Sequence, residues 1–300
     1  MLLPREKKSR KTRQYETRKH LKKARAVLHL VRKEIGRGLF KNEDHALRDV
    51  GRLISEIRDA EVRLQTVREL QTVTRRQRRG RFDKLEEILM LELENFIAAF
   101  AEWQGQAVPI LERVRKEIDC WPVEQFGCKQ FRRSVQTAYK GGRTALAEAK
   151  RVRTTDCFHV FRKEAKQLGY QLRILRPINP VVLKNLSDDL GAVGNLLGRA
   201  HDLSFLAERL RAEPDRADWQ REGRQLLAVI EASQSDLQRG AADLAERFYA
   251  ERPRDFGARV GAWLEDWSKA DRPSVADALV DQSLAGPRPK SRHATRKVPA

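Results

Sequence analysis

Apolar residues recur three and four positions apart along most of the chain, which is the spacing of amphipathic α-helices. Leu21, Leu28 and Val31 show this spacing near the N-terminus, and no proline occurs between Arg5 and Val108. The pattern predicts helices over residues 13–34, 43–72, 82–104, 109–118, 125–150, 156–176, 181–211, 217–250 and 254–268. Strand-like alternation is nearly absent, so the sequence predicts an all-α fold with short connections between antiparallel helices.

The chain is strongly basic, with 61 Lys and Arg against 42 Asp and Glu and a net charge of +19. Residues 1–25 carry +9, residues 150–176 carry +6 and residues 285–300 carry +5. This excess favours a polyanionic partner, such as nucleic acid, an acidic membrane surface or a phosphate polymer. The C-terminal tail is also rich in proline and small polar residues, which predicts disorder.

Several classes of protein do not fit this composition. No apolar run approaches the ~20 residues of a membrane span, and no apolar segment of a secretory signal follows the N-terminal charges. The three cysteines, Cys120, Cys128 and Cys157, are too few and too widely spaced for a disulfide framework or a metal site. We therefore expect neither a membrane protein nor a secreted disulfide-rich protein, and we expect the cysteines to be reduced.

The predicted helix over residues 156–176 has two distinct faces. At about 100° per residue, six polar side chains fall within an arc of about 100°. They are His159, Arg162, Lys163, Lys166, Tyr170 and Arg173. Apolar positions, including Phe161, Leu168 and Leu172, fall on the opposite side. Cations at this spacing repel one another, so the row is either neutralised by acids from other helices, left as a solvated basic face, or used to bind an anion.

Two short motifs repeat along the chain in the same order. Residues 15–25 (YETRKHLKKAR) and 159–170 (HVFRKEAKQLGY) both contain Arg-Lys followed three positions later by Lys, at an offset of 144. An Arg-Asp pair at 58–59 and a His-Asp pair at 201–202 repeat at an offset of 143. Two matches at nearly the same offset predict an internal duplication with about four helices in each half.

These motifs resemble the conserved histidine α-helical domain (CHAD) family. The first half contains ETRKHLKKARAVLHLVR and NEDHALRDVGRLISEIRDAEV; the second contains AYKGGRTALAEAK, FHVFRKEAKQLGYQLRIL and LSDDLGAVGNLLGRAHDLSFL. The resemblance covers about residues 10–250. It implies two four-helix bundles, related by a pseudo-twofold axis, that enclose a basic channel or groove. It also implies binding of inorganic polyphosphate, with location at polyphosphate granules in the cytoplasm.

On this interpretation the chain is a stand-alone CHAD protein. Residues 1–9 are a basic N-terminal extension, residues 10–270 are the domain, and residues 271–300 are a basic disordered tail. The two halves of the domain cover about residues 10–120 and 121–270.

The resemblance also implies which residues contact the polymer. They are Arg18, Lys19, Lys22, Arg25, Arg48, Arg52, Tyr139, Arg143, His159, Arg162, Lys163, Lys166, Tyr170 and Arg173. Supporting roles fall to Asp59, His201 and Asp202, and we expect the two aspartates to orient Arg or His side chains rather than to bind metal. Two positions depart from the family pattern, since Tyr15 stands where the second half has His159, and Gly169 replaces a bulky or basic residue.

The residue types suit a polymer of phosphates. Arginine makes bidentate hydrogen bonds to phosphate oxygens, lysine adds charge, and tyrosine hydroxyls donate hydrogen bonds. His159 is expected to gain charge as pH falls toward ~6.5. The leading hypothesis is therefore a non-catalytic binding module with no cofactor and no metal.

Two other hypotheses stay open at this point. The net charge also fits a general polyanion-binding or nucleic-acid-binding protein, although no aromatic residues are interleaved with the cations for base stacking. An enzyme acting on polyphosphate would need carboxylates that position Mg²⁺ or a nucleophile that accepts phosphate, and neither is visible in the sequence.

Overall fold

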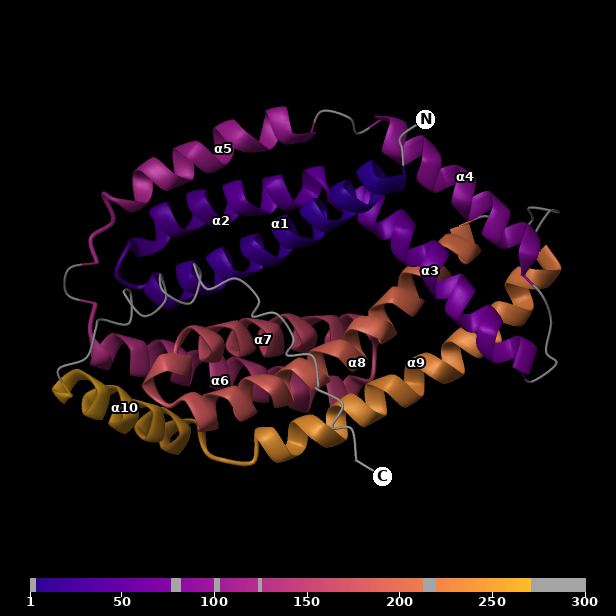
Figure 1. The fold of residues 1–300 in the computed structure, drawn as a ribbon. Helices are drawn as coiled ribbons and strands as arrows, with labels where there is room; N and C mark the ends of the chain where they lie inside the picture. The colour runs from indigo at the N-terminus through magenta and orange to yellow at the C-terminus, as the bar shows by residue number, and fades with distance from the viewer. Residues whose placement is uncertain (1–3, 77–81, 100–102, 124–125, 213–219, 271–300) are drawn as a thin grey trace, which may run out of the picture.

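The computed structural model describes residues 4–76, 82–99, 103–123, 126–212 and 220–270, and the regular elements in these ranges are all helical (Figure 1). They are α1 (Pro4–Val31), α2 (Gly36–Leu53), α3 (Ser55–Arg76), α4 (Asp83–Ala99), α5 (Trp103–Ile118), α6 (Cys128–Val152), α7 (Thr155–Ile174), a 3₁₀ turn η1 (Arg176–Ile178), α8 (Pro180–Ala212), α9 (Gln220–Phe248) and α10 (Pro253–Lys269). The predicted all-α class is confirmed for the described residues. None of these helices is long and apolar enough to cross a membrane.

The largest apolar core lies among α6, α7, α8, α10 and the end of α9, the lower group in Figure 1. The apolar face predicted for α7 is confirmed, because Phe161, Leu168 and Leu172 are each 0% exposed. Thr154 caps α7, since its hydroxyl accepts a hydrogen bond from the backbone N–H of Cys157 at 3.4 Å. The opposite face of α7 is consequently turned away from the core.

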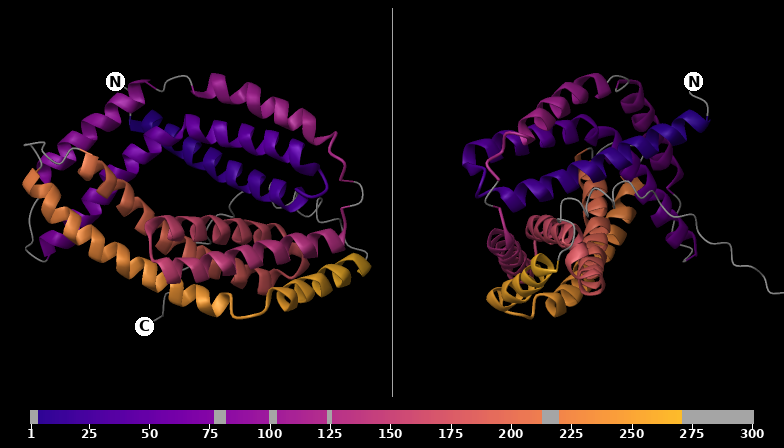
Figure 2. Two further views of the ribbon diagram at one scale, coloured as in Figure 1. Left: turned by 180° about the vertical axis from the view of Figure 1, so that it is seen from behind. Right: turned by 60° about the vertical axis from the view of Figure 1, so that its left-hand side comes forward.

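A second core lies among α1, α2 and α5, the upper group in Figures 1 and 2. Leu28, Val50 and Ala107 are buried there. Helix α1 connects this group to the lower one, because Leu30 packs into the lower core and its carbonyl accepts a hydrogen bond from the Ser134 hydroxyl at 2.7 Å. The two groups are thus held together along α1, α6 and α7.

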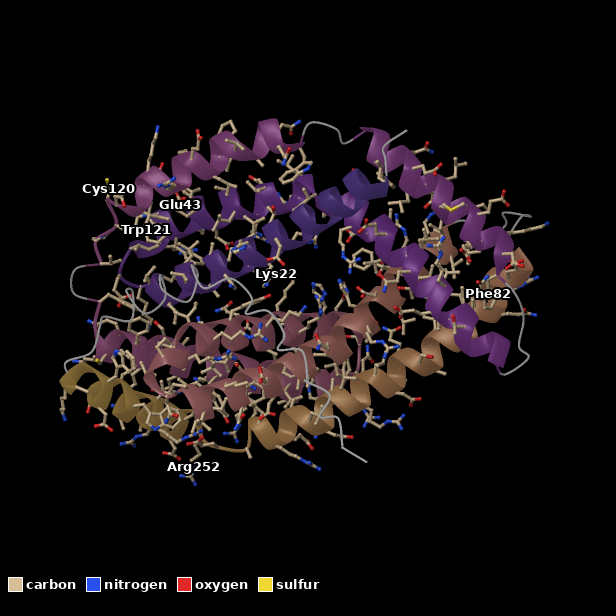
Figure 3. All side chains as sticks on the ribbon, viewed as in Figure 1. Lys22, Glu43, Phe82, Cys120, Trp121 and Arg252 are labelled. Atoms are coloured by element: carbon tan, nitrogen blue, oxygen red, sulfur yellow. The ribbon has the colours of Figure 1, made fainter. Side chains whose placement is uncertain are left out.

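A third core joins elements from both halves of the chain. Helices α3 and α4 pack against the C-terminal part of α8 and the N-terminal part of α9, at the right of Figure 1. Val67, Leu85, Leu206 and Ile230 are each 0% exposed in this cluster, and Phe82 is labelled beside it in Figure 3. The described residues therefore form three apolar clusters, and the division into two four-helix bundles stays a prediction.

The single helix predicted over residues 43–72 is wrong, because it breaks at Ile54. Ile54 leaves the helical conformation with φ −114° and ψ 8°. Its backbone N–H and the Ser55 hydroxyl both donate to the carbonyl of Arg52, the latter at 2.9 Å. A serine hydroxyl that takes a backbone carbonyl in this way competes with the helical hydrogen bond. The break separates α2 from α3, so α3 packs with α4 and α8 instead of continuing along α1.

Two predicted helix starts also differ from the structure. Helix α1 begins at Pro4 rather than at residue 13, with proline in the first turn, where its missing N–H costs no hydrogen bond. Helix α5 begins at Trp103 rather than at 109, with Pro109 inside it. Pro109 and Gly105 are both exposed, so the carbonyl of Gly105 that loses its partner can bond to water.

Candidate functional site

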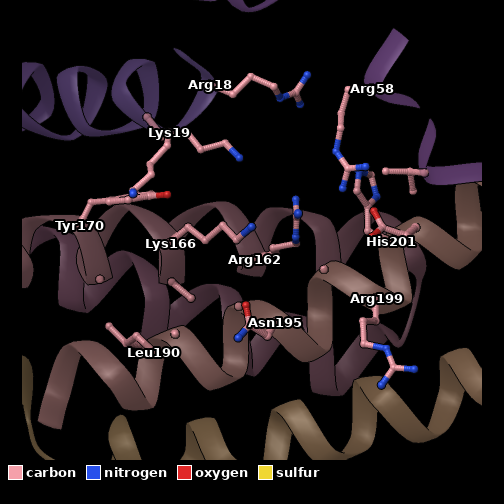
Figure 4. Close-up of a pocket in the computed structure, with 18 of the residues that line it drawn as sticks. Arg18, Lys19, Arg58, Arg162, Lys166, Tyr170, Leu190, Asn195, Arg199 and His201 are labelled. Carbon is pink, nitrogen blue, oxygen red and sulfur yellow. The ribbon is translucent and has the colours of Figure 1, made fainter. Parts of the chain in front are cut away.

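A cleft of about 1040 Å³ lies between α1, α3, α7 and α8. Figure 4 shows Arg18 from α1 and Arg58 from α3 entering it from above, opposite Arg162 and Lys166 from α7. In Figure 3, Lys22 likewise lies between the upper and lower groups of helices. Cations of the two repeated Arg-Lys motifs, on α1 and α7, therefore line opposite sides of one cleft.

The charge of the cleft is predominantly positive. Eight Lys and Arg side chains line it, namely Arg18, Lys19, Lys22, Arg58, Arg162, Lys166, Arg173 and Arg199. The carboxylates that line it are Asp59, Glu61 and Asp202. A concave surface with this imbalance concentrates anions, because low-dielectric walls focus the field of the cations.

Three glycines on α8 make room for the cations of α7. They are Gly191, Gly194 and Gly198. A Cβ atom at these positions would lie 3.3, 3.4 and 3.7 Å from the side chains of Arg173, Lys166 and Arg162, respectively. Each of these cationic side chains of α7 thus packs against a glycine of α8, where no side chain blocks it.

The cations are crowded enough to change their own ionisation. Burial, together with the charges of Arg162 and Lys22, lowers the pKa of Lys166 from 10.5 to about 7. Burial also lowers the pKa of Lys22 to about 8, together with repulsion from Arg18. The cleft by itself therefore carries less positive charge at neutral pH than its composition suggests. A bound anion would raise the pKa values of the two lysines and so restore that charge.

The carboxylates offset this repulsion only in part. Burial raises the pKa of Asp59, against the opposing effect of Arg18, and raises the pKa of Asp202, against that of Arg58. Among the described residues, neither aspartate accepts a hydrogen bond from a cation of the cleft. Both carboxylates act on the cations by electrostatic attraction alone. They do not occupy the N–H donors of the cations, which stay available to a ligand.

A pair of histidines closes one end of the cleft. The Nδ1 atoms of His159 and His201 lie 3.3 Å apart, with ring centroids 4.4 Å apart. Burial and the charge of Arg162 lower the pKa of His201 to about 3, and burial and Lys163 lower that of His159. Both rings are neutral at pH 7, so one Nδ1 donates to the other. The expectation that His159 gains charge as pH falls toward ~6.5 is therefore corrected, because the pKa of His159 is lowered below this value.

The comparison with protein families agrees with this geometry. A model of the CHAD domain matches residues 11–202, about two thirds of the chain. The chain belongs to the CHAD family. No curated protein and no solved structure matches it. The matched range covers α3 and α7 and most of α1 and α8, whereas α9 and α10 lie beyond it and share cores with the matched helices.

The structure brings together ten of the residues predicted for a CHAD site. Lining the cleft are Arg18, Lys19, Lys22, Arg162, Lys166, Tyr170 and Arg173, together with Asp59, His201 and Asp202. His159 does not line the cleft and reaches it through His201. Lys163, also outside the lining, acts on this histidine pair by its charge.

Three of the predicted cations on α1 and α2 lie outside the cleft and have acidic partners. Nε of Arg25 donates to Asp44 at 2.8 Å, and Arg48 lies 3.7 Å from the same carboxylate. Nη1 of Arg52 donates to Asp49 at 2.8 Å. Each of these three guanidinium groups thus has an acidic partner on α2, and the structure does not bring them to the cleft.

The predicted helix α6 residues also lie elsewhere. Tyr139 is 0% exposed, and its hydroxyl bonds to the carbonyls of Phe248 and Glu251 at 3.0 and 3.1 Å. Arg143 donates to the same Glu251 carbonyl at 3.0 Å. Burial raises the pKa of Tyr139 to about 12. Both side chains thus bond to the turn between α9 and α10, and neither lines the cleft.

Several CHAD cleft residues were not among those predicted. Arg58 was seen in a motif but was not assigned to the polymer, and it enters the cleft because α3 diverges from α2 at Ile54. Arg199 and Asn195 lie apart from the main group of cations in Figure 4. The three glycines of α8 are spaced three and four apart and so share one helix face. This spacing could have predicted that long side chains from another helix approach that face.

Proposed function

We propose that this CHAD protein binds inorganic polyphosphate in the cleft without acting on it chemically. The observation that carries the proposal is the facing arrangement of cations from α1 and α3 on one side and α7 on the other. A linear chain of phosphates laid along the cleft would meet donors on both sides. Guanidinium and ammonium groups pair with phosphate oxygens through short, charge-assisted hydrogen bonds.

The lining favours a polymer without bases over nucleic acid. Bases are usually held by stacking on exposed aromatic faces. In the cleft, the guanidinium of Arg173 lies over the ring of Tyr170 at 5.6 Å, and His201 meets the ring of Phe205 at 4.6 Å. Arg173 covers one face of Tyr170 and His201 meets Phe205 edge-on, so the lining offers more charge and hydrogen-bond donors than surfaces for base stacking.

The same proposal includes the duplicated architecture. The rows on α1 and α7 are separated by 144 residues in sequence and meet across one cleft. This meeting supports a pseudo-twofold relation in which each half contributes one wall of a basic groove. A protein with such a site would collect where the polymer is concentrated, so we propose association with polyphosphate granules in the cytoplasm.

The test is a titration with long-chain polyphosphate over a salt series, beside a DNA oligonucleotide of equal total charge. We expect polyphosphate binding to persist at salt concentrations that release the DNA, because a shaped cleft adds to general attraction. Equal and equally salt-sensitive binding of both would indicate a general polyanion surface. Release of phosphate or shorter chains during the incubation would contradict the non-catalytic assignment.

Paired variants locate the site. Arg162→Ala with Lys166→Ala should weaken polyphosphate binding about tenfold or more, since it removes two charge-assisted contacts, while leaving the melting temperature unchanged or higher. The matched control is Arg151→Ala with Arg211→Ala, which removes two cations paired with Glu148 and Glu231 outside the cleft. Equal losses in the two variants would place binding outside the cleft.

A further inference from the structure

A second cavity, of about 550 Å³, lies on another face of α7. Its walls come from the C-terminal end of α1, the residues that lead into α2, the middle of α6, and α7. This volume is within the range of pockets that hold small molecules. The cavity shares no lining residue with the basic cleft, so it needs its own explanation.

Its floor is a row of polar side chains on α7. Glu164, Gln167 and Gln171 are spaced three and four apart and lie between the cationic row and the core face. Gln171 is only 1% exposed, and its amide oxygen has no hydrogen-bond partner among the described residues. An acceptor buried without a donor is costly, so its presence beside a cavity points to a ligand that supplies a donor.

Glu164 adds a second oxygen-bearing group to this floor. Its carboxyl lies against Gly141 of α6 so closely that a Cβ atom there would be 2.8 Å from Oε2. Burial raises the pKa of Glu164, and no cation pairs with it in the described part of the chain. The floor therefore presents hydrogen-bonding oxygens from Glu164 and Gln171, which lie two turns apart on α7.

The rim has the opposite character. Arg32 and Lys33 from the turn after α1 and Arg37 from the start of α2 line it, and none of the three is ion-paired with a described acid. The ring of Phe40 holds the guanidinium of Arg32 at 4.7 Å. Ile35 gives α2 no side-chain cap, so its first N–H groups add partial positive charge to the rim.

We propose that this cavity binds a phosphorylated polyol, with the phosphate at the rim and the hydroxyl groups on the floor. Three cations and a helix N-terminus match a dianionic phosphate better than a single carboxylate. The hydroxyl groups of a polyol supply the donors that Gln171 and Glu164 lack. Polyphosphate offers oxygens but few donors, so the polymer of the first site does not satisfy this floor.

The test uses isothermal titration of the full chain with glucose 6-phosphate, glucose and inorganic phosphate. We expect saturable binding of glucose 6-phosphate, weaker binding of phosphate and little of glucose. Gln171→Leu should reduce glucose 6-phosphate affinity about fivefold to tenfold and leave phosphate affinity unchanged, since it removes one hydrogen bond on the floor. Equal affinities for phosphate and glucose 6-phosphate, or no saturable binding of either, would overturn the proposal.

A second variant keeps the proposal testable if Gln171→Leu fails to fold. Arg37→Gln changes an exposed rim residue and should weaken phosphate and glucose 6-phosphate about fivefold alike. Arg151→Gln, which removes one exposed cation from α6, is the matched control and should change neither. Polyphosphate binding should survive Arg37→Gln, which separates this site from the cleft. Unchanged affinity in Arg37→Gln would overturn the assignment.

Discussion

The ionisation of Lys166 depends on which groups surround it in the cleft. Lys22 and Arg18 face it from α1, Arg162 precedes it by one turn of α7, and Asp202 opposes their effect from α8. Its side chain is half-buried, and burial lowers its pKa further than that of Lys22. Lys166 is therefore the group whose proton should respond most strongly when a polyanion enters.

We expect polyphosphate binding to take up protons above pH 7. The pKa of Lys166 is about 7 in the free protein and rises when phosphates surround it, so the bound state holds more protons between these two values. Affinity should then fall as pH rises above about 7 and level off below it. Calorimetry in two buffers of different ionisation enthalpy measures the uptake directly.

Lys166→Arg provides the control, because arginine stays charged throughout this pH range. Proton uptake at pH 8 should drop in this variant, and the part that persists belongs to Lys22, whose pKa is about 8. Absence of proton uptake by the wild-type protein at pH 8 would contradict the prediction.

Spacing along one helix predicted some site residues well and others poorly. Arg162, Lys166 and Arg173 follow from helical geometry alone, since their side of α7 lies opposite a buried face. Arg25 belongs to an equally regular row on α1, yet Asp44 neutralises it from another helix. A pairing of this kind depends on tertiary packing, which the spacing on α1 does not contain.

At the scale of single elements, the break between α2 and α3 decides what faces the cleft. The carbonyl of Ile54 accepts a hydrogen bond from Nη1 of Arg18 at 3.4 Å. Diverging from that point, α3 brings Arg58 and Asp59 to the cleft. The sequence predicted one continuous helix through Ile54, because Ser55 and the competing hydrogen bond at Arg52 were not recognised as a helix end.

The glycines of α8 give a prediction for one element. Gly194→Leu should weaken polyphosphate binding about tenfold, because the new side chain displaces Lys166 from its position 3.4 Å away and removes a charge-assisted contact. The helix itself should be preserved, since leucine has a higher helix propensity than glycine. Circular dichroism and a polyphosphate titration measure the two effects separately.

Gly105→Leu is the matched control, since a Cβ atom at this exposed position of α5 would meet nothing within 4 Å. It should leave binding unchanged. If both variants bind as the wild-type protein does, the glycines of α8 have no part in positioning the cations.

At the scale of the whole molecule, the third core joins the two halves of the chain. Ile230→Ala should lower the free energy of unfolding by about 2–5 kcal/mol, because Ile230 is fully buried among residues of α3, α4, α8 and α9. Leu91→Ala on α4 is the control, since Leu91 is 60% exposed. Urea denaturation of both variants tests the difference, and equal losses would contradict this account of the core.

The sequence predicted the number and kind of helices far better than their grouping. Amphipathic spacing reports that a face is buried, but not which helix covers it. Val67 on α3 and Leu206 on α8 lie in separate predicted helices, and only the structure shows that they belong to one cluster. The grouping of helices depends on how they cross, and the break at Ile54 changes the direction of α3 and of α4, which packs against it.

The third core also means that neither half of the chain is complete by itself. An isolated first half would expose Val67, Leu85 and Leu89, which α8 and α9 now cover. Such a fragment should stay unfolded or aggregate until a second-half fragment is added, and the pair should then reassemble. In the intact chain, the α3–α4 hairpin of one copy could occupy the same position in another, which is the route to a domain-swapped dimer.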